Sequence, residues 1–287
     1  FSDLEKETGF YKNSIEPRSF NELNSTTVDL YRKNSEEGLE GEIHYYNNIP
    51  LCLKDLFPVL FRYDEINYKW YEVEKIEGLT VSILFTNNQM NNEHLLMIFS
   101  AINRIHLSNK IIDISNVNIY DNYINKLENR YKKYDYSVFP NSQQVYSELK
   151  VGLQEYETSN QGLLGQIHGD TVLTNIMINK FNKIKFIDMR GEIDGQLSVL
   201  GDIFYDWAKL YQSLIGYDEI LLNKTVCNNY KRKLIETFTE LFLEKFTTKD
   251  LSNVKLITKS LLFTLLPLHD NEKCYKFYDL IFSEFLM

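Results

Sequence analysis

The sequence contains little cysteine. Its 287 residues include Cys52, Cys227 and Cys274, which lie far apart and form no CxxC pair. Disulfide-stabilised secreted domains carry dense, even-numbered sets of cysteines, and structural zinc sites carry closely paired ones. Neither kind of scaffold is indicated, and we expect a reducing, cytoplasmic compartment.

Positive charge and long apolar runs are also lacking. The net charge is −9, and the lysines are scattered instead of forming the basic patch of a nucleic-acid binder. A membrane helix needs roughly 18–20 apolar residues, and the longest candidate, LITKSLLFTLLPL, is interrupted by Lys259 and Pro267. The polar, acidic N-terminal stretch does not resemble a signal peptide. We therefore predict no nucleic-acid partner and no membrane span, while the oligomeric state stays open. Because the first residue is Phe1, the sequence is a candidate fragment of a longer chain.

The patterning that is present predicts an α+β, two-lobed protein. Residues 1–78 read as a small N-lobe that carries a sheet and one helix, and Gly78 closes it. Its predicted elements are a strand over 25–33, a helix over 36–49, and a hairpin of 59–65 with 68–78.

Residues 79–287 read as a larger, mainly helical C-lobe. Apolar residues at helical spacing predict a helix over 92–108, and further tyrosine-bearing helices are expected over 118–134 and 141–157. Two short apolar strands, within 166–178 and 183–191, come next. From Asp202 onward we expect three or four helices.

One stretch, QIHGDTVLTNIMI, carries the chemistry. His168, Asp170 and Asn175 precede or begin a short strand, and Asp188 ends the next one. A hairpin would bring these side chains to one edge, where carboxylate and amide oxygens suit Mg²⁺ and leave room for water and phosphate. A carboxylate not bound to metal could accept a proton from an attacking hydroxyl. The competing interpretation is that Asp170 and Asn175 are ordinary turn and capping residues.

With this spacing the chain resembles the aminoglycoside phosphotransferase and choline kinase group, which shares the protein-kinase fold. The resemblance implies that Asp170, with His168 in the same catalytic motif, serves the acceptor hydroxyl, and that Asn175 and Asp188 hold Mg²⁺ on the nucleotide phosphates. Asp206, in GDIFYDWAKLYQS, matches the position that braces the catalytic loop, although it could also be an exposed helix residue.

The same resemblance requires a strand lysine on the phosphates that pairs with a helix glutamate. Lys33 and Glu42 are the candidates. Arg32 is an alternative phosphate contact, Glu40 is an alternative partner, and Lys33 could instead be a solvated lysine.

The linker after the predicted hairpin resembles a kinase hinge. There the backbone of Glu74 and Ile76 could bind the purine of ATP or GTP. No glycine-rich loop precedes the first strand, as is the case in many small-molecule kinases.

Arg190 stands where many members of this group carry a second acidic residue. It could bind phosphate or an anionic substrate through its forked donors, and Glu192 or Asp194 could supply the missing carboxylate. No Ala-Pro-Glu element follows, which favours a small-molecule acceptor over a protein.

The stretch LLPLHDNEK resembles kinase-like proteins of bacterial capsule and surface-glycan clusters, so the expected acceptor is a sugar or sugar-like alcohol. His269, next to Asp270, could line its pocket or could cap a helix. Tyrosines and acids that could form the pocket wall are Glu148, Glu155, Tyr211, Tyr217 and Asp218. The alternative function is a pseudokinase-like binding module, against which the complete Asp170, Asn175 and Asp188 set argues.

Overall fold

The computed structural model describes residues 21–25, 30–108, 117–269 and 272–287. Its N-terminal part forms a four-stranded antiparallel sheet. The strands lie in the order β1-β2-β4-β3. The elements of this part are β1 (Asn21–Ser25), β2 (Leu30–Ser35), α2 (Glu40–Asn47), the 3-10 helix η1 (Leu51–Leu56), β3 (Leu60–Tyr63) and β4 (Trp70–Glu74). The predicted helix and the β3–β4 hairpin are confirmed. The first predicted strand lies later than expected, at 30–35, and residues 26–29 lie outside the described part.

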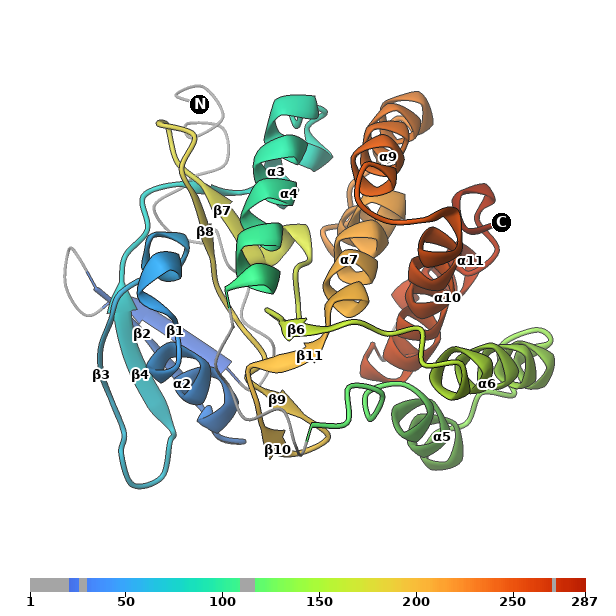
Figure 1. Cartoon of the computed structure of the whole chain (residues 1–287), viewed down its shortest axis with the longest axis horizontal. Coiled ribbons are helices and arrows are strands. Elements are labelled where there is room, and N and C mark those ends of the chain that lie inside the picture. Colours follow the sequence, from blue (N-terminus) through green and yellow to red (C-terminus); the bar gives the residue numbers. More distant parts are fainter. Residues whose placement is uncertain (1–20, 26–29, 109–116, 270–271) are drawn as a thin grey trace.

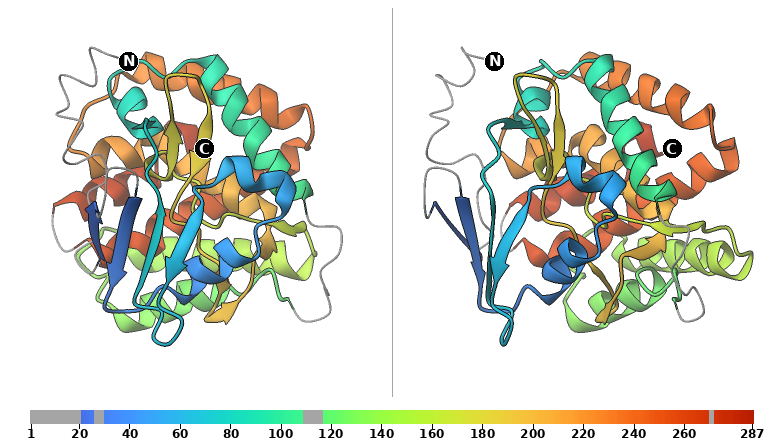
Figure 2. Two further views of the ribbon diagram at one scale, coloured as in Figure 1. Left: turned by 90° about the vertical axis from the view of Figure 1, so that its left-hand side faces the viewer. Right: turned by 60° about the vertical axis from the view of Figure 1, so that its left-hand side comes forward.

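Strand alternation decides which side chains of β2 face α2. Lys33 and Ser35 are buried, whereas Arg32 is partly exposed. Lys33 lies opposite Tyr71 of β4 in the register. Figure 2 shows α2 between this sheet and the β9–β10 hairpin (Glu192–Ile193 and Gln196–Leu197).

The α2 helix meets the loop after Asp188 without any intervening side chain. A Cβ built on Gly41 would collide with the backbone carbonyl of Arg190, and one built on Gly191 would collide with the backbone of Gly41. Gly191 also has a φ of 63°, in the left-handed region. Two backbones therefore touch where the sheet-bearing part meets the rest of the molecule.

The chain leaves the first sheet after β4 and enters a second one. There β5 (Leu79–Thr80) pairs antiparallel with β7 (Ile176–Ile178), which pairs with β8 (Ile184–Phe186) as predicted from the two apolar runs. A third pairing joins β6 (Leu164–Gln166) to β11 (Leu200–Asp202). Figure 1 shows these short strands between the first sheet and the helices.

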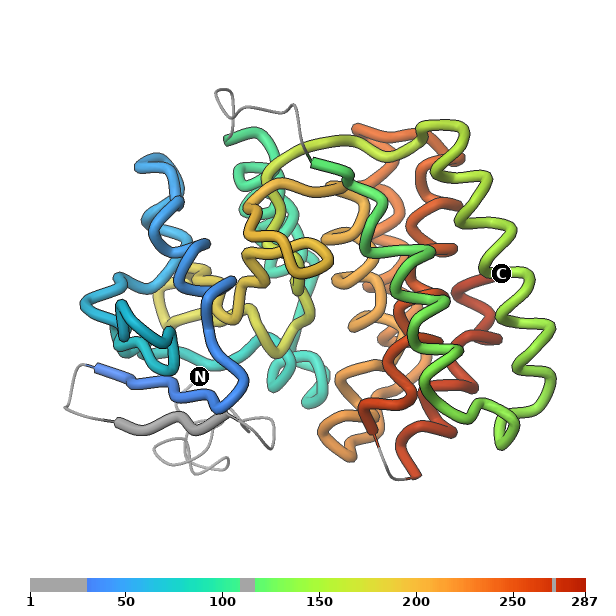
Figure 3. The backbone as a smooth tube through the Cα atoms, turned by 90° about the horizontal axis from the view of Figure 1, so that it is seen from below, coloured from blue at the N-terminus to red at the C-terminus, as the bar shows by residue number. Residues whose placement is uncertain are grey.

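Helices make up most of the remainder. They are α3 (Val81–Thr86), α4 (Asn92–Leu107), α5 (Ile124–Lys133), α6 (Ser142–Thr158), α7 (Ile203–Gln212), α8 (Asp218–Leu221), α9 (Asn228–Leu243), α10 (Thr248–Leu265) and α11 (Lys273–Leu280). The helices over 92–108 and 141–157 are confirmed, but α5 begins only at Ile124. The described part after Asp202 contains five α-helices instead of three or four, because a π-turn with Gly216 at φ 138° separates α7 from α8. Figure 3 shows α5 and α6 alongside the C-terminal helices, at the opposite end from the first sheet.

The α10 helix and its short extension, Thr248–Leu268, are long and apolar enough to cross a membrane by length and composition alone. That is weak support for a span, because 61% of its apolar window is buried inside the protein and core helices pass the same test. Val254, Ile257 and Phe263 of α10 are fully buried. The helix is therefore part of the hydrophobic core.

Candidate active site

Asp206 holds the loop that carries the HGD motif. Its two carboxylate oxygens accept the backbone N–H groups of His168 at 2.9 Å and Gly169 at 2.8 Å, and its own carbonyl accepts the Thr171 hydroxyl. The side chain is fully buried, which excludes an exposed helix position. Gly169 has a φ of 84°, and a Cβ there would lie 2.6 Å from the Cβ of Arg190. The loop therefore has one conformation, fixed from α7.

The His168 ring lies inside the protein. It is fully buried and stacks at 11° on Phe57. Its Nδ1 accepts the Asp170 N–H at 3.1 Å, and its Nε2 lies 3.0 Å from the carbonyl of Ile187, so the ring proton belongs on Nε2. Burial lowers the pKa of His168, which keeps the ring neutral. The ring ties the Asp170 backbone to the chain just before Asp188.

The Asp170 carboxylate is held on both sides. Asn175 donates from Nδ2 to Asp170 Oδ2 at 2.9 Å and also to its carbonyl. Lys209, one turn along α7 from Asp206, places its Nζ 2.9 Å from Oδ1. These contacts orient the carboxylate, which a proton acceptor requires.

Lys33 joins the first sheet to the second. Its Nζ lies 2.7 Å and 2.9 Å from the two oxygens of Glu42 and 2.8 Å from Asp188 Oδ1. Burial lowers the pKa of Lys33, but attraction to Glu42 and Asp188 outweighs it, so the pKa is raised and the lysine is charged. Burial raises the pKa of Glu42, partly offset by Lys33 and by the Tyr71 hydroxyl, which donates at 2.6 Å. Lys33 is thus buried and paired, and it is not a solvated lysine.

The alternatives to this pair lie elsewhere. Arg32 forms an ion pair with Glu72 at 2.8 Å and stacks on Trp70, on the other face of the strand. Glu40 is exposed at the start of α2. Among the described residues, only the Lys33–Glu42 pair reaches the predicted metal ligand Asp188.

The residues present fit a magnesium ion. Asn175 turns its amide nitrogen to Asp170, which leaves the amide oxygen as its other polar group, and Asp188 keeps a second carboxylate oxygen beside the one that Lys33 contacts. The described residues contain no cluster of three His, Cys, Asp or Glu side chains for a metal. Mg²⁺ on nucleotides needs only one or two carboxylates, because phosphates and water complete its octahedron.

The Glu74 and Ile76 backbone amides, which were predicted to bind the purine, differ in their surroundings. The Glu74 amide donates to Val59 O at 2.9 Å, and the Glu74 carboxylate binds Lys185 at 3.0 Å. That amide is occupied within the sheet. No described residue accepts a hydrogen bond from the Ile76 amide, two positions further on.

Comparison with solved structures relates this arrangement to known proteins, whereas neither protein-family models nor curated protein sequences match the chain. Choline kinase LicA from Streptococcus pneumoniae aligns with a TM-score of 0.62 and 14% identity, over 99% of this chain and 98% of that one. The GDP complex of wild-type aminoglycoside 2'-phosphotransferase-IIIa aligns with a TM-score of 0.60 and 15% identity, over 98% and 95% of the two chains. A choline/ethanolamine kinase family protein from Mesorhizobium loti gives 0.59 and 11%, over 98% and 96%.

The chain has the fold of these structures. The α+β, protein-kinase-like architecture that the HGD motif predicted is thereby confirmed.

Arg190 of this kinase fold points away from the Lys33 pair. Its backbone N–H donates to His168 O at 2.9 Å, and its Nη1 donates to the Tyr205 hydroxyl at 3.1 Å. Lys126 of α5 reaches the same hydroxyl at 3.3 Å. Lys126, Tyr205 and Lys209 were not predicted from the sequence, although Tyr205 and Lys209 are four residues apart, one turn of helix, on either side of Asp206.

The side chains expected to wall an acceptor pocket do not gather in the kinase fold. Tyr211 is buried and donates to Phe285 O, Glu148 and Glu155 are exposed on α6, and Tyr217 stacks on Phe277. Asp218 is fully buried, and burial raises its pKa to about 7.

The remaining candidates lie at the periphery. His269 packs on the Phe277 ring at 4.8 Å, and Asp270 lies outside the described residues. Glu192 is half-buried and Asp194 is exposed on the β9–β10 hairpin.

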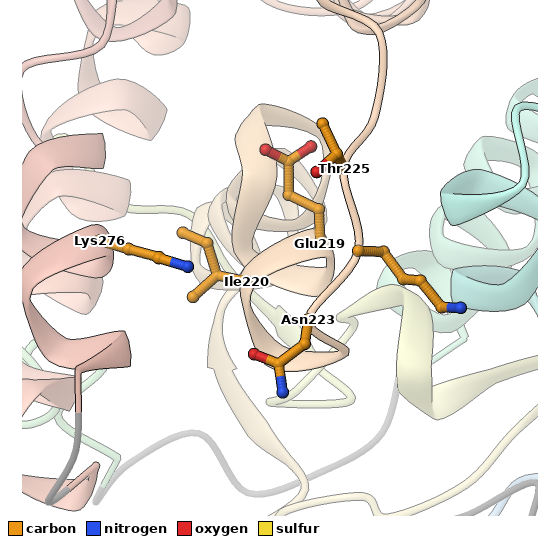
Figure 4. A pocket seen from close by; sticks show the side chains of 6 residues that line it. Glu219, Ile220, Asn223, Thr225 and Lys276 are labelled. Atoms are coloured by element: carbon orange, nitrogen blue, oxygen red, sulfur yellow. The ribbon is translucent and has the colours of Figure 1, made fainter.

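A cavity of about 260 Å³ lies between α8 and α11 (Figure 4). Its lining residues are Glu219, Ile220, Asn223, Lys224, Thr225 and Lys276. None of the residues predicted for catalysis or nucleotide binding lines this cavity, so it is separate from the candidate site.

Proposed function

We propose that the protein is a phosphotransferase that moves the γ-phosphoryl group of ATP or GTP to a hydroxyl of a small molecule in the cytoplasm. The observation that carries this proposal is the convergence of two sets of side chains: Lys33, Glu42 and Asp188 on one side, and Asp170 with Asn175 on the other. These are the parts that a kinase needs for nucleotide phosphates and for an acceptor hydroxyl.

The residues have separate tasks in this proposal. Lys33, oriented by Glu42, binds the nucleotide phosphates. Asn175 and Asp188 would hold Mg²⁺, which neutralises charge on the β- and γ-phosphates. Asp170 accepts the hydroxyl proton while the acceptor oxygen bonds to the γ-phosphorus and the bond to the β-phosphate oxygen breaks, releasing the nucleoside diphosphate. His168 acts as a positioning residue, since both ring nitrogens are engaged with backbone groups.

The division of labour follows two proposed lobes, residues 1–78 for the nucleotide and 79–287 for catalysis and the acceptor. The similar structures include proteins described as choline, ethanolamine and aminoglycoside kinases. For this chain we propose a sugar or sugar-like alcohol, on the resemblance of the LLPLHDNEK stretch to kinase-like proteins of surface-glycan clusters.

The test is a nucleotide-consumption screen with Mg²⁺ across sugars, polyols, amino alcohols and aminoglycosides. The proposal is supported if a hydroxyl compound raises nucleotide turnover and is recovered from the reaction as its phosphate ester. Tight Mg·ATP binding without turnover for any hydroxyl compound, together with tight binding of a partner chain, would favour the pseudokinase-like module instead.

A further inference from the structure

Three cationic side chains converge around one phenol beside Asp170. Lys126 Nζ and Arg190 Nη1 lie 3.3 Å and 3.1 Å from the Tyr205 hydroxyl. Lys209 stands one turn from Tyr205 on α7 and contacts Asp170 Oδ1 at 2.9 Å. We refer to Lys126, Arg190, Tyr205 and Lys209 as the cationic cluster. It is assembled from α5, α7 and the loop after Asp188.

The cationic cluster lacks compensating acids. Among the described residues, the one carboxylate that forms an ion pair with the cationic cluster is Asp170, which pairs with Lys209. Neither Lys126 nor Arg190 has a carboxylate within 4.0 Å in the described part of the chain; each has the Tyr205 hydroxyl as its hydrogen-bond partner. Two half-buried cations that share one neutral oxygen repel one another, so an anion between them would be strongly favoured.

The charges of the cationic cluster perturb its own members. Burial alone would raise the pKa of Tyr205, but attraction to Lys126, Arg190 and Lys209 lowers it to about 7. Burial, together with repulsion from Arg190 and Lys209, lowers the pKa of Lys126 to about 8, against the opposing pull of Tyr205. The shift of Tyr205 reports an excess of positive potential at this position, whereas that of Lys126 comes mainly from burial.

The position of the cationic cluster points to the acceptor rather than to the nucleotide. The Lys33–Asp188 ion pair marks the phosphate side, and Asn175 holds Oδ2 of Asp170. Lys209 of the cationic cluster contacts the other oxygen, Oδ1. The helices α5 and α7, which carry Lys126, Tyr205 and Lys209, lie across the short strands from the first sheet (Figure 1).

Resting on the proposed function, we infer that the alcohol acceptor carries an anionic group, a phosphate or a carboxylate, which Lys126, Arg190 and Tyr205 bind while its hydroxyl meets Asp170. An acceptor of this class differs from the cationic amines named for the similar kinases. A quaternary or primary ammonium group would be repelled at the same place.

Inorganic phosphate is the first probe. With Mg·AMP-PNP saturating the nucleotide site and its γ-position, calorimetry should detect phosphate binding to the wild-type protein. Lys126→Met should weaken it about tenfold or more, since a charge-assisted hydrogen bond is lost, and Lys126→Arg should largely restore it. Lys132→Met is the matched control, because Lys132 lies on the same helix, is 70% exposed and contacts only Glu128.

The opposite results overturn the inference. The first is that phosphate does not bind at all, and the second is that wild type and Lys126→Met bind it equally. The third is that phosphate binding is lost when AMP-PNP saturates the nucleotide site, which would assign the cationic cluster to the γ-phosphate. If Mg·AMP-PNP itself does not bind, the proposed function is contradicted instead. Phosphate binding measured without nucleotide then still tests the cationic cluster.

Acceptors on a common scaffold give a second readout. Glycerol, glycerol 3-phosphate and 3-amino-1,2-propanediol form one set; glucose, glucose 6-phosphate and glucosamine form another. In any set whose members are phosphorylated, the anionic member should have the highest kcat/KM. Its KM should be lower than that of the neutral member in the wild type, and this difference should be lost in Lys126→Met. A neutral or cationic member that is phosphorylated best would contradict the anionic acceptor while supporting the kinase reaction.

Discussion

At the scale of single residues, the site is organised around the two oxygens of Asp170. Asn175 holds one oxygen and Lys209 holds the other, so the carboxylate cannot rotate freely. Lys209 must release or share its oxygen when a hydroxyl approaches that side of the carboxylate. The neighbours of Asp170 therefore set the orientation of its carboxylate.

Asp170→Asn tests this role. The amide cannot accept the hydroxyl proton, so turnover should fall by about 10²–10⁴-fold, while Mg·ATP affinity stays near the wild-type value. Steady-state kinetics and calorimetry measure the two quantities. Asp135→Asn, at an exposed position, serves as the control. Turnover like that of the wild type in Asp170→Asn would remove Asp170 as the proton acceptor.

The Tyr205 hydroxyl makes anion binding depend on pH. The groups facing it are Lys126, Arg190, Lys209 and Asp170. Burial and Asp170 raise the pKa of Tyr205, but attraction to the three cations outweighs them and lowers it to about 7. Below this pH the phenol is neutral and the cationic cluster attracts anions; above it a phenolate repels them, and Lys126, with a pKa lowered to about 8, begins to lose its charge.

Sulfate binding under saturating Mg·AMP-PNP should therefore weaken as the pH rises from 6 to 8, and Tyr205→Phe should remove the step near pH 7. Sulfate is the suitable probe because its charge is constant in this range. An unchanged pH profile in Tyr205→Phe would assign the dependence to another group.

At the scale of elements, α7 supplies both the brace and part of the cationic cluster. Asp202 caps its N-terminus by accepting the Phe204 N–H, Asp206 holds the catalytic loop, and Lys209 reaches Asp170. His106 of α4 adds a contact to Asp206 Oδ2 at 3.0 Å. One helix thus sets the positions of groups that lie 35 or more residues earlier in the chain.

Asp206→Asn should loosen this arrangement. One acceptor oxygen becomes an NH₂ group that faces a buried backbone N–H, which should lower the free energy of unfolding by roughly 2–4 kcal/mol. Chemical denaturation measures the loss, with Asp279→Asn on the exposed face of α11 as the control. A loss no larger than that of the control would mean that Asp206 does not brace the loop.

Periodicity was sufficient for the longer elements. Helical spacing located α4 and α6, and alternation located the β3–β4 hairpin. The strands β5, β6 and β9–β11 have only two or three residues each, too few to show a period, so sequence patterns did not reveal them.

The grouping of Asp170, Asn175 and Asp188 was more predictable than the surroundings of Tyr205 for a related reason. The three residues lie within one short stretch, so their spacing indicated that a hairpin would bring them together. Lys126 reaches Tyr205 only because α5 packs near α7, and no local pattern encodes that contact. The acidic residues Glu148 and Glu155 misdirected the prediction, since they lie on the solvent face of α6.

At the scale of the whole molecule, the groups proposed to bind the nucleotide come from two separate sheets. Lys33 belongs to the first sheet and Asp188 follows β8 of the second, and their ion pair at 2.8 Å links the two sheets, as does the Lys185–Glu74 pair at 3.0 Å. A ligand that binds both sides stabilises the assembled molecule, by about 2.7 kcal/mol when its concentration is 100 times the Kd.

Mg·ATP should accordingly raise the thermal unfolding midpoint of the wild type, and the rise should require Mg²⁺. Asp188→Asn should lose most of it, because the charged anchor of the metal is removed. Asn is preferable to Ala here, since residue 188 has a φ of 59°, which Asn tolerates better. Full Mg²⁺-dependent stabilisation of Asp188→Asn would place the metal elsewhere.

The contact between Gly41 and the Arg190–Gly191 backbone has a consequence for control of the protein. Some kinases are silenced by swinging the helix that carries the paired glutamate outward. Here that helix rests directly on the main chain that follows the proposed metal ligand Asp188, and Lys33 contacts both Glu42 and Asp188. An outward movement of α2 would have to break this backbone contact as well as the Lys33–Glu42 ion pair, which makes it a costly means of control.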